Sequence, residues 1–141
     1  MIVVPFIPAH LESLEVHEYM AHIQREFGQK YGEMLAEFPS YSGIVDGKVI
    51  ICSGVVQAGV NRWNAWALMS KESGRHMIPI TREVMKYLKT SHVPRIETHV
   101  RSDFKAGHKW AKMLGFKNET PDGMKNWGDD GYDYCLYART N

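Results

Sequence analysis

The chain has 141 residues, of which 44% are hydrophobic and 23% charged, and its formal net charge is +1. These values are typical of one soluble globular domain, so residues 1–141 are expected to form a single domain. The small net charge and the lack of a basic block argue against binding to nucleic acid. No apolar run approaches the roughly 18–20 residues that a membrane-spanning helix needs.

The amino-terminal stretch MIVVPFIPAH has no basic segment, and Pro5 and Pro8 interrupt its short apolar run. We therefore expect no signal peptide. Cys52 and Cys135 lie far apart in strand-like stretches, where they are expected to be small apolar fillers in a reducing compartment. The expected location is the cytoplasm, and no metal site is expected.

In chain order, residues 2–8 (IVVPFIP) predict a first strand that ends at Pro8. Between His10 and Phe38, apolar residues recur at helical spacing. Gly28 and Gly32 weaken the middle of this segment, so we expect two helices or one broken helix, ended by Pro39.

A meander of three strands is predicted next. Residues 41–46 form the first strand, and Asp46-Gly47 is a strong signal for a hairpin turn. Residues 48–57 are nearly all apolar, so the second strand is expected to be covered on both faces. Residues 62–69 (RWNAWALM) form the third strand.

The second half of the chain returns to helices. The segment after residue 76 has a helical pattern that includes Ile80, Val84 and Leu88, and residues 95–100 (RIETHV) form another strand. A compact helix follows in residues 103–116, with Asp103 as its N-cap. Gly115 suits a left-handed C′ position with the next residue folding back. Residues 123–127 and 132–139 are predicted to form a closing hairpin around GDDG.

This order of elements predicts an α/β fold, which some schemes class as α+β. The meander implies antiparallel pairing, while the strand–helix–strand unit from Trp63 to Val100 implies one right-handed parallel crossover. We therefore expect a mixed, mostly antiparallel sheet of six to seven strands with helices on both faces.

The corner Ser73-Gly74-Arg75-His76 has two interpretations. Free N–H groups at a helix start, a glycine and the nearby cations would form an anion cradle. Alternatively, Ser73 is an N-cap and Gly74 a turn. The stretch matches neither strong phosphate-binding motif, and local sequence favours the second interpretation. Pro79 is awkward for a helix that begins at Gly74, because it removes a backbone hydrogen bond just past the first turn.

Other polar candidates are weaker. His17 and His22 are five residues apart, which places them on different helix faces and not in a zinc motif. Glu97 and His99 alternate on one strand, so they share a face and form either an acid–base pair or a polar pair at the sheet margin. The four tryptophans are more typical of core or rim packing than of a binding site.

Taken together, the element order and two local stretches resemble the GNAT superfamily of N-acetyltransferases over nearly the whole chain. The stretch KESGRH stands where that family has a loop of the form Q/R-x-x-G-x-G/A, and WAKMLGF matches the end of the family's later helix. The piece RIETHVRSDFKAGHKWAKMLGF also resembles small GNAT-like proteins of bacteriophages and prophages.

The resemblance implies an acetyl-CoA site. Its loop would hold the coenzyme A pyrophosphate, and the strand before it would pair with the pantetheine arm between two splayed strands, residues 62–69 and 95–100. The amine acceptor, a small molecule or a protein, would enter between the early helices and the last hairpin. The implied cofactor-binding residues are Leu68, Met69, Lys71, Ser73, Gly74, Arg75, His76 and Trp110.

The sequence also departs from the family pattern. His76 replaces a small residue, Phe104 stands where asparagine is common, and Ala111 stands where a tyrosine commonly protonates the thiolate. Glu97 is the candidate general base, with His99 beside it. The expected function is transfer of an acetyl group to an amine. The alternative is an inactive GNAT-fold binding or structural protein, such as a phage virion component contacting other virion proteins. A homodimer is common among the proteins that it resembles.

Overall fold

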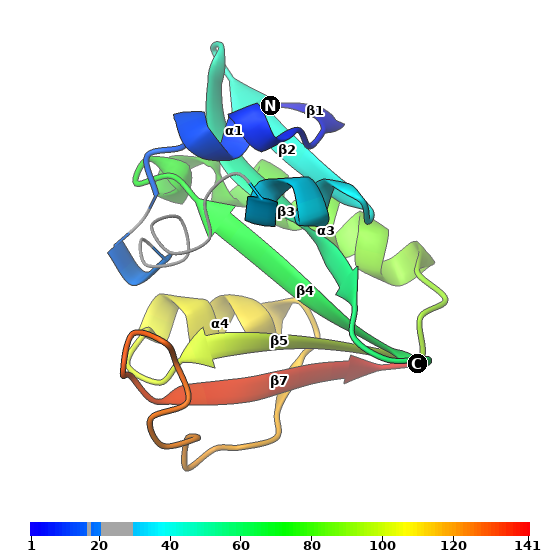
Figure 1. Ribbon diagram of the computed structural model, residues 1–141, viewed down its shortest axis with the longest axis vertical. Coiled ribbons are helices and arrows are strands. Elements are labelled where there is room, and N and C mark those ends of the chain that lie inside the picture. Colours follow the sequence, from blue (N-terminus) through cyan, green and yellow to red (C-terminus); the bar gives the residue numbers. More distant parts are fainter. Residues whose placement is uncertain (17, 21–29) are drawn as a thin grey trace.

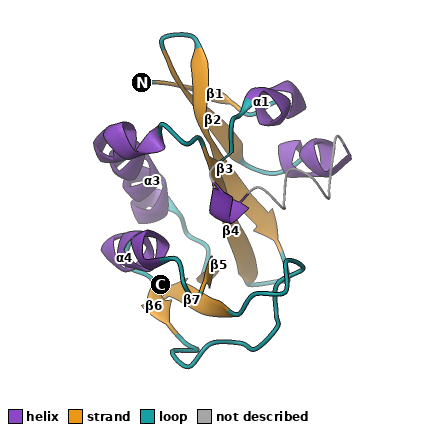
Figure 2. Ribbon diagram, turned by 90° about the vertical axis from the view of Figure 1, so that its left-hand side faces the viewer, coloured by secondary structure: helices purple, strands orange, loops and turns teal. Residues whose placement is uncertain are grey.

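The computed structural model describes residues 1–16, 18–20 and 30–141. A seven-stranded sheet with the order β1-β2-β3-β4-β5-β7-β6 forms the middle layer (Figure 1). Figure 2 shows α3 and α4 on one face of the sheet, and α1 with the helix of residues 30–36 on the other. The strands are β1 (Ile2–Pro5), β2 (Ser40–Val45), β3 (Lys48–Gln57), β4 (Arg62–Met69), β5 (Arg95–Arg101), β6 (Lys117–Asn118) and β7 (Tyr134–Thr140). The named helices are α1 (Pro8–Ser13), η1 (Glu18–Met20), η2 (Ser73–His76), α3 (Met77–Thr90) and α4 (Lys105–Met113).

The sheet is mixed and mostly antiparallel, as expected. Among the strands of the described residues, β4 and β5 alone pair in parallel, and the other neighbouring strands pair antiparallel. The helix α3 connects the two parallel strands. The structure therefore confirms the predicted α/β fold class. None of the helices in the described part of the chain is long and apolar enough to cross a membrane.

The β2–β3 hairpin forms at the predicted turn. Asp46 and Gly47 both have positive φ, 50° and 77°, as the tightest hairpin turns require. On β3, Cys52 packs against Leu11 of α1, whereas Ile51 packs against Ile80 of α3. The strand is thus covered on both faces, as its apolar sequence indicates.

The amino-terminal boundaries differ from expectation. The first strand ends at Pro5, and Pro8 begins α1, because proline is favoured in the first turn of a helix. The next helix covers residues 30–36 and ends before Pro39. His17, His22 and Gly28 lie outside the described residues, so the predicted break around Gly28 is not described.

The closing hairpin was predicted wrongly. Its carboxyl-terminal strand forms β7, but β7 pairs with β5 and with the short β6, and residues 123–127 contribute only an isolated bridge between Met124 and Tyr134. Gly123 and Asn126 have φ values of 82° and 54°, which are incompatible with an extended strand.

The start of α4 was also misassigned, although its end was not. Its N-cap is Phe104 rather than Asp103. Asp103 instead accepts two hydrogen bonds from the Arg101 guanidinium, at 2.7 and 3.0 Å. At the other end, Gly115 has φ 89° and the N–H of Phe116 donates to the carbonyl of Ala111, as predicted.

The apolar core forms three clusters. One lies under α4 against β5 and β7, one under α1 against β3 and β4, and one between α3 and β3. Cys52 and Cys135 are free and buried in different clusters, as expected for small apolar fillers. Burial raises the pKa of the Cys52 thiol to about 11.

We predict that Gly54→Ala destabilises the fold. A Cβ at Gly54 would lie 2.5 Å from the carbonyl oxygen of Pro39 and 2.8 Å from the Cα of Ser40, so backbone atoms would have to move. The expected loss in the free energy of unfolding is about 1–3 kcal/mol. Urea unfolding measures it, with Gly74→Ala as the control, since a Cβ at Gly74 meets no atom within 4 Å. Equal stability of the two variants would contradict the prediction.

Candidate functional site

A notch opens in the sheet where β4 and β5 part. The two strands pair only at Arg62–Arg95, Trp63–Ile96 and Asn64–Glu97. Beyond these pairs, β4 continues to Met69 and β5 to Arg101, and Figure 1 shows the two strands diverging. On its other edge, β4 remains paired with β3 as far as Met69. We call the opening between residues 65–69 and 98–101 the notch. Within the described sheet, its β4 side has no partner strand.

Side chains alternate across the two strands that border the notch. Trp66 and Leu68 pack in the cluster under α1, so Asn64 lies on this face as well. Glu97 is in register with Asn64, which places Glu97 and His99 on the same face. The opposite side has the half-buried alanines at 65 and 67 and faces α3.

At the carboxyl end of β4, the chain turns through η2 directly into α3. The N–H groups of residues 70–73 are all used: Ser70 donates to Ile50, Lys71 to Glu15, Glu72 to the Ser70 hydroxyl and Ser73 to the Ser70 carbonyl. An anion cradle would therefore rest on N–H groups from Gly74 onward. Lys71, Gly74 and Arg75 are exposed.

The structure contradicts the N-cap part of the simpler interpretation of this corner, whereas Gly74 does lie in the turn η2. Ser73 is buried, and η2 has Glu72 as its N-cap while α3 has His76, neither with a side-chain cap bond. Gly74 does not have a positive φ, so its backbone conformation does not require glycine. Because α3 begins at Met77, Pro79 lies in its first turn and the apparent conflict disappears.

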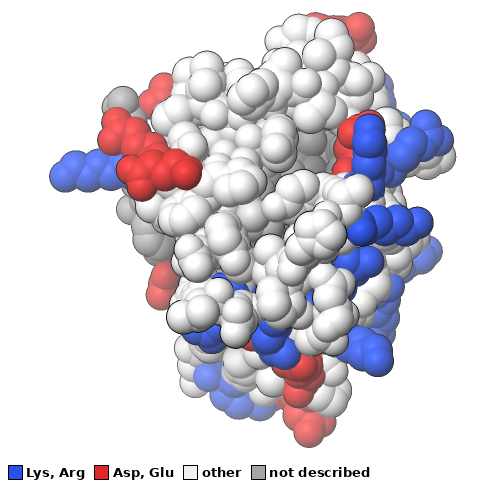
Figure 3. Space-filling model, turned by 90° about the vertical axis from the view of Figure 1, so that its right-hand side faces the viewer, with Lys and Arg blue, Asp and Glu red and all other residues white. Residues whose placement is uncertain are grey.

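The outer surfaces of the two helices behind the notch are basic. The exposed cations are Arg82, Lys86 and Lys89 on α3, and Lys105, Lys109 and Lys112 on α4. Figure 3 looks at the side where α3 ends and shows Lys and Arg gathered along one margin of a largely uncharged face. Such a surface favours an anionic ligand.

Trp110 joins the two helices behind the sheet. Its indole Nε1 donates to the Thr81 hydroxyl at 2.9 Å. It also packs against both the cluster under β5 and the cluster between α3 and β3. Trp110 thus fixes the spacing of α3 and α4, and its contact with a cofactor stays a prediction.

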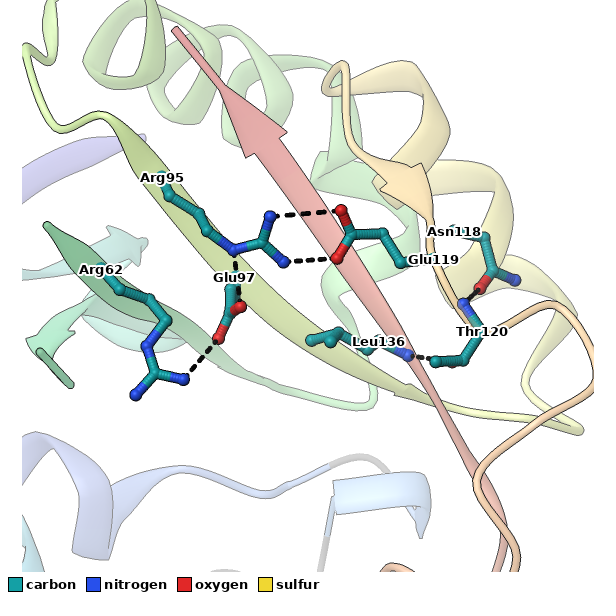
Figure 4. A network of polar contacts seen from close by, with 7 residues as sticks. All are labelled: Arg62, Arg95, Glu97, Asn118, Glu119, Thr120 and Leu136. Atoms are coloured by element: carbon teal, nitrogen blue, oxygen red, sulfur yellow. Dashed lines mark hydrogen bonds and ion pairs between the residues drawn. The ribbon is translucent and has the colours of Figure 1, made fainter.

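Glu97 is held at the closed end of the notch. Its side chain is buried, and its oxygens face Arg95 Nε at 2.7 Å and an Arg62 nitrogen at 3.7 Å (Figure 4). Arg95 also binds Glu119 with both terminal nitrogens. This bond lowers the pKa of Glu119, while the bonds to Glu119 and Glu97 raise the pKa of Arg95. An amine would have to compete with two arginines for Glu97, whose role as base stays a prediction.

His99 has a different environment. Its ring stacks on Trp127, with ring centroids 4.3 Å apart and planes inclined by 16°. Burial lowers the pKa of His99 below its ordinary value of 6.5, although the nearby Glu97 charge raises it in part. The imidazole is therefore neutral near pH 7 and has a lone pair to accept a proton.

A stack of side chains that we did not predict lies beside the open end of the notch. Tyr19 stacks on Phe104 with centroids 4.4 Å apart, and the Arg101 guanidinium lies 4.7 Å from the Tyr19 ring and 3.3 Å from the Tyr132 ring. These residues come from η1, β5 and the segments before α4 and β7. Their distance in sequence left no local signal.

Ala111 lies in the core. It is 4% exposed and belongs to the cluster with Val100 and Tyr137. The Tyr137 hydroxyl is engaged with His108 Nδ1 at 2.6 Å. His108 Nε2 faces the carbonyl of Ser102, which only accepts, so Nε2 carries the proton and Tyr137 donates to Nδ1.

Solved structures share this fold. One is Ard1 from Thermoplasma volcanium, with TM-score 0.78 and 14% identity, covering 99% of this chain and 96% of that one. Another is the ribosomal-protein-S18-alanine N-acetyltransferase from Escherichia coli, with TM-score 0.71, 15% identity and coverages of 99% and 92%. A third is a GNAT-family acetyltransferase from Bacillus anthracis, with TM-score 0.68, 10% identity and coverages of 98% and 93%. The fold is the GNAT fold. No protein-family model matches the sequence, and neither does any curated protein.

Within this fold, a tyrosine is predicted not to fit at the position of Ala111. Ala111→Tyr should lower the free energy of unfolding by about 1–3 kcal/mol, because the buried site has no room for a ring. Ala106→Tyr, on the exposed side of the same helix, should stay within about 0.5 kcal/mol of the wild type. Urea unfolding compares the two, and an unchanged Ala111→Tyr variant would refute the assigned packing.

His99 is predicted to make the fold less stable in mild acid. Its pKa in the folded state is below that of the unfolded chain, about 6.5, so the unfolded state binds the proton more readily as pH falls. Stability from the neutral imidazole is present above this value and is lost as pH falls below it. The melting temperature of the wild type should therefore drop more between about pH 7.5 and 5 than that of His99→Gln. Parallel curves for the two proteins would show that His99 does not contribute.

Proposed function

We propose that the chain is an acyl-CoA-dependent N-acyltransferase that uses acetyl-CoA as co-substrate and an amine as acceptor. The observation that carries this proposal is the notch: β4 and β5 separate after Asn64 and Glu97, and α3 begins just beyond the open end. A free strand edge beside a helix start suits an extended chain that ends in phosphates. The basic outer faces of α3 and α4 and the likeness to acetyltransferase structures give further support.

Each part of the chain would have a defined role. The backbone of Leu68 and Met69 would pair with the pantetheine arm and polarise the thioester carbonyl. Residues from Gly74 to His76 would face the pyrophosphate, with Lys71 and Arg75 supplying positive charge. Ser73 is buried, so its role would be to hold the turn rather than to touch the ligand.

In the reaction, the amine nitrogen would attack the thioester carbonyl carbon and the carbon–sulfur bond would break. A base must take the proton that the nitrogen loses. His99 is neutral near pH 7 and lies on the acceptor side, while Glu97 would hold Arg62 and Arg95 in place or accept the proton itself. Since Ala111 has no proton to give, the leaving thiolate would take its proton from water. Positioning of the amine and the thioester would supply much of the rate.

A second candidate is a GNAT-fold protein without catalytic activity, such as a structural component of a phage particle. His76 in the phosphate loop and Ala111 in place of tyrosine favour it. The two candidates differ at their first step, because only the enzyme needs to bind acetyl-CoA.

We predict that acetyl-CoA stabilises the fold. A ligand that binds only the native state adds about 2.7 kcal/mol at about 100 times its dissociation constant. Thermal unfolding with and without millimolar acetyl-CoA measures the shift. No shift in the wild type would favour the structural protein over the enzyme.

Gly74→Asp and Gly74→Ala make this test specific to the corner. Both variants should fold like the wild type, since a Cβ at Gly74 has open space around it. The carboxylate of Gly74→Asp should weaken acetyl-CoA binding by repelling the phosphates, whereas Gly74→Ala should bind as the wild type does. Calorimetric affinities that are equal in all three proteins would show that the pyrophosphate does not lie at this corner.

A further inference from the structure

The exposed cations of α3 and α4 are arranged in two rows. They are Arg82, Lys86 and Lys89 on α3 and Lys105, Lys109 and Lys112 on α4. In each helix they stand at positions i, i+4 and i+7, so they lie along one side of that helix. At a rise of about 1.5 Å per residue, each row is about 10 Å long, and Lys89 lies about 18 Å along α3 from Met77. We call the surface that these six residues cover the basic face. It extends well beyond the corner at which the pyrophosphate would bind.

A hydrogen bond holds the two rows side by side. Trp110 Nε1 donates to the Thr81 hydroxyl at 2.9 Å, and these two residues are the sequence neighbours of Lys109 and Arg82. Figure 2 shows α3 and α4 next to each other on the same face of the sheet. The axes of packed helices are about 8–10 Å apart. The basic face is therefore a flat array about as wide as each row is long.

This face concentrates a charge that the whole chain does not have. The two helices contain six cations and one acid, Glu83, and thus carry +5, so the rest of the chain carries −4 to give the net charge of +1. None of the six cations forms an ion pair with another described residue, whereas Arg62, Arg95 and Arg101 are each paired with a carboxylate. Like charges four residues apart destabilise a helix. An external anion would remove this repulsion.

Two exposed apolar side chains continue the rows. Ile78 stands four residues before Arg82, and Met113 stands four residues after Lys109, so both lie on the basic side of their helices. Their exposed fractions are 75% and 55%. Large apolar side chains among lysines suit the boundary of a lipid bilayer, where apolar groups enter the hydrocarbon and lysines reach the phosphates.

Nucleic acids are the other large polyanions that a basic surface binds, and the basic face fits them less well. The helices α3 and α4 contain no Asn or Gln, and their aromatic residues, Tyr87 and Trp110, are partly buried in the core. The face thus has no amide to read a base edge and no exposed ring to stack on a base. A phosphate backbone would also leave Ile78 and Met113 in water, whereas a bilayer removes them from it.

We propose that the basic face docks on the surface of an anionic lipid bilayer. The six cations contact the phosphates of the head groups, and Ile78 and Met113 enter the layer beneath them. In this orientation α1 and the helix of residues 30–36, on the other face of the sheet, point away from the lipid (Figure 2). The inference depends on neither acetyl-CoA binding nor catalysis.

Co-sedimentation of the full chain with vesicles, in the absence of acetyl-CoA, tests the docking. The wild type should bind vesicles of equal parts phosphatidylglycerol and phosphatidylcholine and should not bind vesicles of phosphatidylcholine alone. Binding should weaken between about 0.1 M and about 1 M salt, because the screening length falls from about 10 Å to about 3 Å. No binding of the wild type to the anionic vesicles at the lower salt concentration would overturn the proposal.

Charge variants locate the docking face. Each lysine near an anionic surface strengthens binding by about fivefold, so replacing all three α4 lysines by glutamine should weaken vesicle binding by about 100-fold. The matched control removes the same charge outside the two helices, by replacing Lys30, Lys48 and Lys125 with glutamine, and should bind like the wild type. Circular dichroism and melting temperature verify that both variants fold. If the α4 variant does not fold, the same three changes on α3, at Arg82, Lys86 and Lys89, replace it. Equal weakening by the basic-face variant and its control would show that only net charge matters, and the docking face would be wrong.

Apolar variants separate lipid from other polyanions. Ile78→Ser should weaken vesicle binding by about tenfold, the contribution of one large apolar side chain removed from water. Met113→Ser should act in the same direction. The control is Val60→Ser, between β3 and β4, because Val60 is 89% exposed and lies outside the basic face. Unchanged vesicle binding by both Ile78→Ser and Met113→Ser would contradict docking on lipid. Tighter binding to a short DNA duplex or to polyglutamate than to the anionic vesicles would assign the face to a different partner and overturn the proposal.

Discussion

The short parallel pairing of β4 with β5 is the constraint on which the rest of the structure depends. Three residue pairs join the two halves of the sheet, after which the strands diverge. An unpaired strand edge is costly when buried and invites a partner when exposed. The molecule keeps this edge open by fixing the strands from outside the ladder. The ion pair between Arg62 of β4 and Glu97 of β5 joins the strands at the closed end, while helices pack behind the open end.

The apolar core is divided in the same way as the sheet, between the half that ends at β4 and the half that begins at β5. One apolar cluster serves β5 and β7, and two others serve β3 and β4. Val84 and Trp110 are partly buried side chains that touch both the first cluster and the one between α3 and β3. The two halves are therefore joined by the three residue pairs between β4 and β5 and by the helices α3 and α4, rather than by a continuous ladder.

Local sequence predicted those parts of the fold in which neighbouring residues decide the structure. Asp46-Gly47 defined its hairpin, the period of Ile80, Val84 and Leu88 indicated α3, and Gly115 marked the end of α4. Prediction failed where a competing side-chain contact decides the local structure. Asp103 looked like a helix cap, but the Arg101 guanidinium competes for its carboxylate. Residues 123–127 looked like a strand, but the Asn126 N–H donates to the Asp133 carboxylate and Asn126 has φ 54°.

The candidate site, like the fold, could be predicted only in part from the sequence. The resemblance to the GNAT superfamily implied where two strands would separate, and alternation placed Glu97 and His99 on one face. No pattern in the sequence could reveal that Arg62 pairs with Glu97 or that Trp127 stacks on His99. Each of these properties depends on contacts between segments far apart in the chain, and only packing decides them.

The two buried cysteines make it possible to measure the local opening of each half of the sheet. Cys52 lies in the cluster under α1, and Cys135 lies in the cluster under α4. A thiol reagent reaches a buried cysteine only when the structure around it opens, so its labelling rate measures the free energy of that local opening. The labelling rates of Cys52 and Cys135 thus report separately on the two halves of the sheet. A ligand that bridges the notch would slow the labelling of both cysteines, whereas one that binds a single half would slow only the labelling of the cysteine in that half.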